Sequence, residues 1–164
     1  GMFNGFLHSI SGGHIASIDW LGDPKLALPS IALMSIWAGV GFQMVIILAG
    51  LQEIPHELYE AASIDKAGKL AQFRHVTLPS LRNTLIFVVM ITTIFSLRLF
   101  DQVYLMTAGG PLDSTTTVMY LSVTKAFKDG NVGSSSAMTV IFVLIIVAIT
   151  LIQRRLLRQE TEIK

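Results

Sequence analysis

Cysteine is absent from the 164 residues of this sequence. Disulfide bonds, thiolate metal ligands and a cysteine nucleophile are therefore excluded. Charged residues are scarce as well, at 14% of the chain, and the formal net charge is only +1. No cluster of Lys and Arg alternates with aromatic residues, which is the pattern of a nucleic-acid-binding surface. We therefore expect no nucleic-acid partner.

Motifs for nucleotide binding and catalysis are also missing. The sequence has no Gly-x-x-x-x-Gly-Lys-Ser/Thr motif, so any ATP would have to be bound by another protein. The histidines lack the spacing of a helical metal site, and no nucleophile has a base at a plausible spacing. These absences predict that the chain is not an enzyme and has no catalytic residue, no metal site and no cofactor.

Apolar residues, by contrast, are abundant and gathered into long runs. They make up 52% of the sequence, and the mean hydropathy is +0.62. Segment 28–51 contains no charged residue, and a run of about 20 apolar residues is long enough to cross a bilayer as a helix. We therefore predict an all-α membrane protein with lipid as its first partner and a transmembrane helix at 28–51.

Two further transmembrane helices are predicted at 81–106 and 136–153. The apolar part of the first, 84–105, contains Arg98 and Asp101. Its Leu, Ile, Phe and Val residues favour insertion by roughly 4 to 8 kcal/mol, against a penalty of roughly 5 to 7 kcal/mol for two charges at mid-membrane. Because Arg98 lies off-centre, the penalty is smaller, and we expect insertion with help from neighbouring helices.

Basic residues in the connecting segments predict the orientation. Short cytoplasmic loops are rich in Lys and Arg, so segments 52–80 and 154–164 should be cytoplasmic, and segments 1–27 and 107–135 should lie outside. The basic residues in or beside the cytoplasmic segments are Lys66, Lys69, Arg74, Arg82, Arg154, Arg155, Arg158 and Lys164, against Lys25, Lys125 and Lys128 outside. A chain with three spans and a cytoplasmic C-terminus has its N-terminus outside. We therefore expect that the chain is a fragment preceded by further membrane crossings, or that a partner chain supplies those crossings.

The predicted cytoplasmic segment 52–80 has the pattern of two short helices joined by a bend. Pro55 suits the first turn of a helix, and Glu57 and Glu60 lie near its positive N-terminal end. Gly68 can end or bend that helix. A narrow face of mostly small residues lets another protein approach closely, and it consists of Leu58, Ala61, Ala62 and Asp65.

Two short sequences in this segment have a characteristic spacing, Glu60-Ala61-Ala62 and Val76-Thr77-Leu78-Pro79. Together they resemble the EAA motif of permease subunits in binding-protein-dependent ABC importers. Lys66 stands where the family has glycine, and Gly68 follows two residues later, so the bend is open between these two positions. In the family, this loop docks into a cleft of the ATPase subunit and transmits its closure to the membrane helices. The resemblance implies ATPase-coupling roles for Glu60, Ala61, Ala62, Asp65, Lys66, Gly68, Leu78 and Pro79.

Further sequences extend the resemblance over nearly the whole chain. They are Trp37, Gly41-Phe42, the runs 49–55, 100–104 and 107–111, Thr115-Thr116-Thr117 and Gln153-Arg154-Arg155. These sequences are similar to the maltose and glycerol-3-phosphate branch of the permeases. The resemblance implies the MetI-like permease fold in the bacterial inner membrane, with this chain supplying three transmembrane helices of a six-helix core.

The same resemblance implies a function and a set of partners. The chain would be a permease subunit of an ATP-driven importer of a sugar or sugar-like solute. Its partners would be ABC ATPase subunits, a second permease subunit in a heterodimer, and an extracytoplasmic solute-binding protein. The alternative is a truncated membrane interaction protein that keeps the ATPase-docking loop but transports nothing.

Two features have two interpretations each. Arg98 and Asp101 lie three residues apart on one face of the predicted helix, which favours a mutual ion pair. Alternatively, Arg98, Asp101 and Gln102 border the solute path, because polar groups inside a membrane tend to face cavities. Segment 114–128 predicts an amphipathic helix outside the membrane, which is either an interfacial helix or a docking surface for a solute-binding protein.

Overall fold

The computed structural model describes residues 1–12 and 17–158. The described residues form helices joined by turns, which confirms the all-helical prediction. In chain order the elements are α1 (Met2–Ile10), α2 (Ala27–Gln52), α3 (His56–Ile64), α4 (Lys69–Gln72), the π-helical turn η1 (Phe73–Thr77), α5 (Leu78–Ser80), α6 (Arg82–Leu97), α7 (Asp101–Met106), α8 (Val118–Phe127) and α9 (Val132–Arg158).

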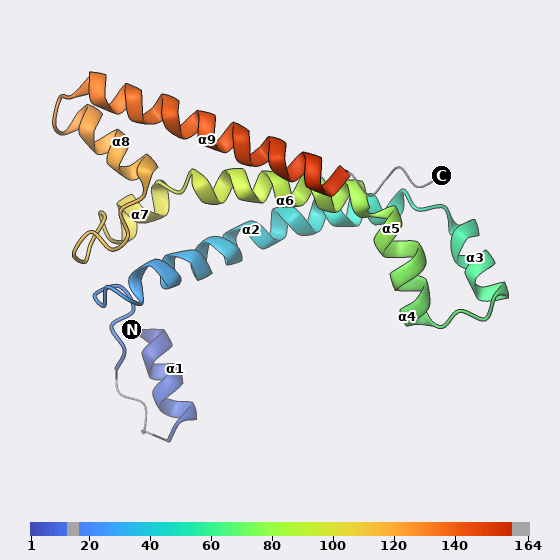
Figure 1. Ribbon diagram of the computed structural model, residues 1–164. Coiled ribbons are helices and arrows are strands. Elements are labelled where there is room, and N and C mark those ends of the chain that lie inside the picture. The colour runs from blue at the N-terminus through green and yellow to red at the C-terminus, as the bar shows by residue number, and fades with distance from the viewer. Residues whose placement is uncertain (13–16, 159–164) are drawn as a thin grey trace.

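Three long helices run side by side, with α6 between α2 and α9 (Figure 1). Two neighbouring threonines of α6 reach opposite partners. Gln43 Nε2 on α2 donates a hydrogen bond to Thr92 Oγ1 at 2.9 Å. Gln153 Nε2 on α9 donates to Thr93 Oγ1 at 2.9 Å. Such polar contacts supplement van der Waals packing between membrane helices, so they help to hold α6 between its two neighbours.

The long helices turn large apolar side chains outward. Trp37 on α2 is 84% exposed, and Leu144 on α9 is 63% exposed. α2 and α9 have mean hydropathies of 2.1 and 2.7 and are long and apolar enough to cross a membrane. Segments 69–80 and 82–97 together form a third candidate, bent by 65°. The described part of the chain therefore contains two membrane-spanning helices, or three if the bent pair is one span.

A break interrupts the helix that the sequence led us to expect across 84–105. α6 ends at Leu97, and α7 begins only at Asp101. The hydroxyl of Thr117 donates to the carbonyl oxygen of Leu99 at 2.8 Å. This bond uses an acceptor that a continuous helix would give to its own backbone. The side chain of Thr117 thus satisfies a backbone acceptor that the break leaves without a helical partner. How much of segment 81–106 lies in the membrane stays a prediction.

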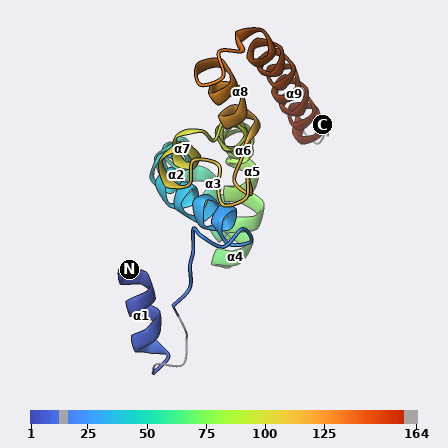
Figure 2. The same ribbon diagram turned by 90° about the vertical axis from the view of Figure 1, so that its left-hand side faces the viewer.

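The helix expected within 114–128 is α8, which packs against the start of α9 (Figures 1 and 2). The Thr117 hydroxyl caps α8 by accepting a bond from the backbone N–H of Tyr120 at 3.1 Å. Between the helices, Ser135 Oγ donates to the carbonyl of Ser122 at 2.7 Å. The hydroxyls of Ser122 and Thr139 lie 2.6 Å apart. Small hydroxyl residues therefore allow the two backbones to approach closely.

The two ends of the three long helices carry different structures. The short helices α3 to α5 and the C-terminal end of α9 lie at one end, whereas α7 and α8 lie at the other (Figure 1). Arg82 Nη2 donates to the carbonyl of Leu157 at 2.7 Å, which ties the start of α6 to the end of α9. The predicted cytoplasmic segment 52–80 thus shares an end with residues 154–158, as the orientation requires. Residues 159–164 of the predicted tail lie outside the described part.

Candidate functional site

The segment between α2 and α6 folds as a helical hairpin (residues 53–81). We call it the coupling hairpin after the role that the resemblance to the EAA motif predicts for it. Pro55 precedes α3 with an extended backbone, and Glu57 lies in the first turn of the helix. An acidic side chain there interacts favourably with the helix dipole. The second arm consists of α4, η1 and α5. The sequence predicted both helices, and the bend between them is now located.

The bend lies at Lys66, the position of the family's glycine. Lys66 has a φ of 58°, in the left-handed region, whereas Gly68 has an ordinary φ of −68°. The Ala67 N–H bonds to the carbonyl of Ala62 at 2.9 Å, and the Lys66 N–H bonds to that of Ser63 at 3.0 Å. These two bonds form a Schellman motif, which usually has glycine at the left-handed position. α3 therefore ends in a Schellman motif that has lysine at the left-handed position instead of the usual glycine.

Side-chain hydrogen bonds brace the two arms of the hairpin against each other. The hydroxyls of Tyr59 on α3 and Thr77 in η1 lie 2.9 Å apart, and Thr77 is buried. Nearer the bend, Gln72 Nε2 donates to Ser63 Oγ at 3.0 Å and to the carbonyl of Ala67 at 3.2 Å. The two arms are therefore connected by side-chain hydrogen bonds near both the base and the tip of the hairpin.

The outer face of α3 is exposed and partly apolar. Leu58, Ala61 and Ile64 follow at three-residue spacing, and Ile64 is 81% exposed. Glu60 is also exposed, with Oε1 3.2 Å from Nδ1 of His56. Ala62 is half-buried. The sequence reasoning placed Leu58 and Ala61 on this face, with Glu60 beside it, but missed Ile64, which the same three-residue spacing could have revealed.

The coupling hairpin joins the long helices through Leu78 and Pro79 in α5. Both residues are exposed, and the next residue but one, Leu81, is buried. The second arm and α6 meet there at the 65° bend. The arm also contains η1, and single π-helical turns occur often at functional sites. The second arm therefore leads directly into the start of α6 at this bend.

Arg98, Asp101 and Gln102 lie at the opposite end of α6, around the break. Arg98 follows the last residue of α6, and Asp101 and Gln102 begin α7. Arg98 and Asp101 are exposed, and among the described side chains they form no ion pair with each other. The predicted ion pair is wrong because the break removes the shared helix face on which it depended.

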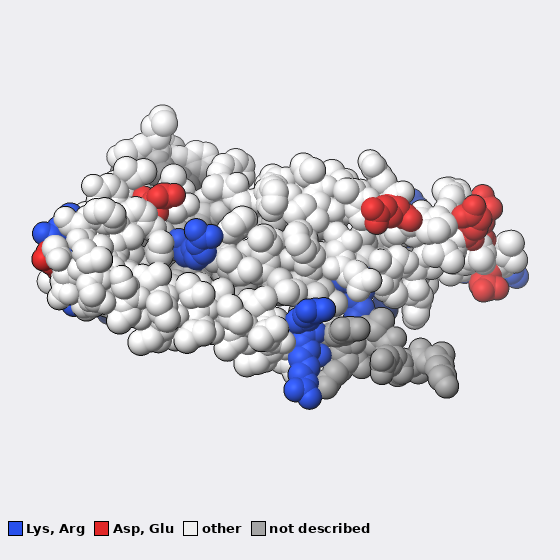
Figure 3. Space-filling model, turned by 90° about the horizontal axis from the view of Figure 1, so that it is seen from above, with Lys and Arg blue, Asp and Glu red and all other residues white. Residues whose placement is uncertain are grey.

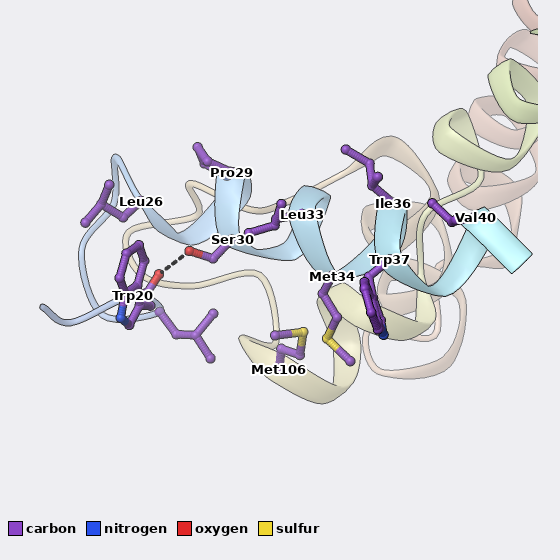
Figure 4. A pocket seen from close by; sticks show the side chains of 11 residues that line it. Trp20, Leu26, Pro29, Ser30, Leu33, Met34, Ile36, Trp37, Val40 and Met106 are labelled. Carbon is purple, nitrogen blue, oxygen red and sulfur yellow. Dashed lines mark hydrogen bonds between the residues drawn. The ribbon is translucent and has the colours of Figure 1, made fainter. Parts of the chain in front are cut away.

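An open apolar hollow of about 790 Å³ lies beside the first half of α2 (Figure 4). Trp37 and Met34 of α2 line it together with Met106 of α7 and Trp20. Its described lining contains no charged side chain, and Arg98, Asp101 and Gln102 are not part of it. The hollow therefore has the chemistry of a surface for lipid or for another helix, and the three polar residues do not converge on it.

Metal-binding chemistry has no support among the described residues. No group of three or more His, Asp or Glu side chains is placed to hold an ion within residues 1–12 and 17–158. Nothing in the hairpin or around the break of α6 pairs a nucleophile with a base.

Comparison with known proteins places this geometry in context. The family model described as "binding-protein-dependent transport system inner membrane component" matches residues 2–161. The trehalose/maltose transport system permease protein of Thermococcus litoralis is 37% identical over 152 residues, which cover 93% of this chain and 50% of that protein. The sulfoquinovosyl glycerol transport system permease protein of Agrobacterium fabrum is 41% identical over 143 residues, which cover 86% of this chain and 46% of that protein.

A solved structure shows the same fold. It is that of a bacterial ABC transporter involved in the import of the acidic polysaccharide alginate, with a TM-score of 0.84 and 21% identity, over 99% of this chain and 56% of that one. The fold is therefore the MetI-like permease fold. The chain spans about half the length of the curated relatives it matches. From the family match over nearly all its residues, the chain belongs to the binding-protein-dependent transport system inner membrane components, a family of transport permeases rather than enzymes.

Proposed function

We propose that this chain is part of a permease subunit of an ATP-driven importer for a sugar or sugar-like solute. The named relatives support this solute class, since they are permeases for trehalose/maltose and for sulfoquinovosyl glycerol. Transport proceeds by alternating access, and ATP hydrolysis takes place on attached ATPase subunits. The observation that carries the proposal is the coupling hairpin, a braced unit with an exposed face at one end and α6 at the other.

The hairpin transmits ATPase closure through contact at α3. Leu58, Ala61 and Ile64 offer a narrow apolar surface, with Glu60 beside it. Exposed apolar patches of this kind mark interaction sites. The hydrogen bonds of Tyr59 and Gln72 hold α3 against the second arm, so that contact at α3 displaces both arms together. Leu78 and Pro79 then pass the displacement to α6, while Lys66 fixes the bend and Asp65 and Gly68 flank it.

The remaining partners act on the other side of the membrane. A solute-binding protein delivers the solute, as in the alginate transporter solved in complex with its solute-bound periplasmic protein. A second permease subunit completes the path. Arg98, Asp101 and Gln102 are proposed to border this path, because they lie where α6 is interrupted and could present polar groups to a cavity formed with a partner.

Glu60→Lys and Ala61→Trp test the coupling role in the importer that contains this chain. Both residues are exposed, so the changes should leave the hairpin folded while reversing charge or adding bulk on the docking face. We expect ATPase association to weaken at least about tenfold, as for a central interface residue. Co-purification of the ATPase and solute-stimulated hydrolysis in reconstituted vesicles measure the effect.

Asp129→Lys is the matched control, since Asp129 is an exposed acidic residue between α8 and α9 at the other end of the molecule. It should leave ATPase association unchanged. Normal association and stimulated hydrolysis in both hairpin variants would show that this segment is not the coupling element. If the unmodified assembly binds the ATPase but takes up no solute, the alternative is favoured, in which this chain docks the ATPase and transports nothing.

A further inference from the structure

The first helix, α1, has an apolar face and a polar face. Met2, Phe6 and Ile10 follow at four-residue spacing, so they lie within about 80° of the helix circumference at 100° per residue. Asn4 and His8 each lie about 160° from Phe6 by the same count. Met2 is 96% exposed, Phe6 62% and Ile10 70%. These three residues thus form an apolar face of α1 that is open in the described part of the chain.

The polar face of α1 is tied to the segment that leads into α2. Asn4 Nδ2 donates a hydrogen bond to the carbonyl of Ile18 at 2.7 Å, and Trp20 Nε1 donates to Asn4 Oδ1 at 2.8 Å. The hydroxyl of Ser30 on α2 in turn donates to the carbonyl of Trp20 at 3.1 Å (Figure 4). Because these contacts use the side of α1 that carries Asn4, the apolar face points away from them.

α1 runs across the direction of the long helices. Figure 3 shows charged side chains toward both ends of the long helices and a largely uncharged stretch between them, so the bilayer lies across their length. In Figure 1, α1 crosses the direction of α2 at the level of its first turns. In Figure 2, where α2 is foreshortened, α1 is still seen from the side. α1 therefore lies parallel to the membrane plane, at the level where α2 enters the bilayer.

The lipid-compatible surface of α2 continues to α1 through Trp20. This residue lines the outer end of the apolar hollow beside α2. Tryptophan favours the membrane interface, because its ring is apolar while its indole N–H needs a polar partner. That partner is Asn4 of α1. α1 itself contains no Asp, Glu, Lys or Arg, so its apolar face can enter lipid without burying one of these charges.

We propose that α1 is an interfacial helix whose apolar face lies in the leaflet at which α2 begins, the extracytoplasmic one in the predicted orientation. Such helices lie in the interface plane with their apolar face about 5–10 Å into the boundary between headgroups and acyl chains. Burial of apolar surface holds α1 there, and attraction to anionic lipid does not contribute. Through Asn4 and Trp20, the helix holds the start of α2 at a fixed depth. The inference depends on α2 spanning the membrane and not on the solute or the ATPase.

Spin labels in the importer that contains this chain, reconstituted in phosphatidylcholine nanodiscs, test the proposal. The chain has no cysteine, so Phe6→Cys and His8→Cys each give it one label when the rest of the assembly is cysteine-free. Power saturation with oxygen and with a water-soluble nickel chelate measures the depth of each label. We expect the Phe6 label to collide mainly with oxygen and the His8 label mainly with nickel. Their depths should differ by about 10 Å, the diameter of a helix.

His8→Cys is the matched control, an exposed position two residues from Phe6 on the opposite face. Labels at Met2 and Ile10 should behave like the Phe6 label, and they carry the test if Phe6→Cys disturbs folding. A nickel-accessible apolar face would overturn the proposal, because the face then lies in water. Exclusion of both reagents would also overturn it, because a protein surface then covers the face. Depths that appear only when phosphatidylglycerol is added would contradict binding without charge.

Discussion

Lys66 ends α3 in a conformation that costs an L-residue about 1–2 kcal/mol and glycine nothing. Glycine in turn loses roughly 0.5–1 kcal/mol more backbone entropy on folding. We therefore expect Lys66→Gly to stabilise the coupling hairpin by about 0.5–1 kcal/mol. Hydrogen exchange of the α3 amides in the purified protein measures this as a rise in protection of about two- to fivefold.

Lys69→Gly is the matched control for Lys66→Gly, since it also replaces a lysine of the hairpin with glycine, three residues farther along the chain. Lys69 begins α4 with helical geometry, so glycine should lower the protection of the second arm. If Lys66→Gly also lowers protection, the left-handed ending of α3 does not exist in solution. The two lysines thus separate a conformational effect from the loss of a charge.

Individual residues were predictable from the sequence where local spacing decides their role. The spacing of Glu60-Ala61-Ala62 and Leu78-Pro79 located the hairpin, and the family pattern placed its bend at Lys66 as one of two positions. The partial burial of Ala62 was not foreseen. The break after Leu97 was also missed, because a hydrogen bond from Thr117, a residue from a later turn, compensates for it.

Among the helices, the contact of α2 with α6 depends on a glycine. A Cβ on Gly50 would lie 2.7 Å from Thr84 Oγ1 and 3.1 Å from Leu81 Cδ2. We expect Gly50→Ala to destabilise the packing by about 1–3 kcal/mol, because both γ atoms of Thr84 and the Leu81 side chain would have to shift to make room for the added methyl group. The midpoint of thermal unfolding in detergent should fall.

Gly41→Ala on the same helix provides the contrast, since a Cβ added at Gly41 would have nothing within 4 Å. There alanine should be neutral or stabilising by about 0.5–1 kcal/mol, through its higher helix propensity. Equal effects at the two positions would mean that α2 and α6 do not approach each other closely at Gly50.

Elements were predicted well where hydropathy alone defines them. The expected spans 28–51 and 136–153 fall within α2 and α9, because long apolar runs have few alternatives to a membrane helix. Boundaries depend on contacts between distant segments and were less accurate. The helix within 114–128 starts at Val118, where Thr117 caps it, and residues 114–117 are not helical.

For the whole molecule, the main expectation is its orientation in the membrane. The structure brings the basic segment 52–80 and residues 154–158 to one end, and the connection from α7 to α8, which contains Gly110, to the other (Figure 1). Reporter fusions at Lys66 and Lys164 should therefore give cytoplasmic signals, and a fusion at Gly110 should give an extracytoplasmic one. A cytoplasmic signal at Gly110 would contradict the topology.

The two threonine contacts of α6 determine how this helix can move. Thr92 and Thr93 point about 100° apart around the helix axis, and they bond to α2 and α9 respectively. Rotation of α6 about its axis would break both bonds, whereas tilting about their level would preserve them. In such a tilt the two bonds would mark the pivot, with the hairpin about 16 Å away on one side and Arg98 about 8 Å away on the other, at 1.5 Å per residue. A push at the hairpin would then move Arg98 in the opposite direction by about half the distance.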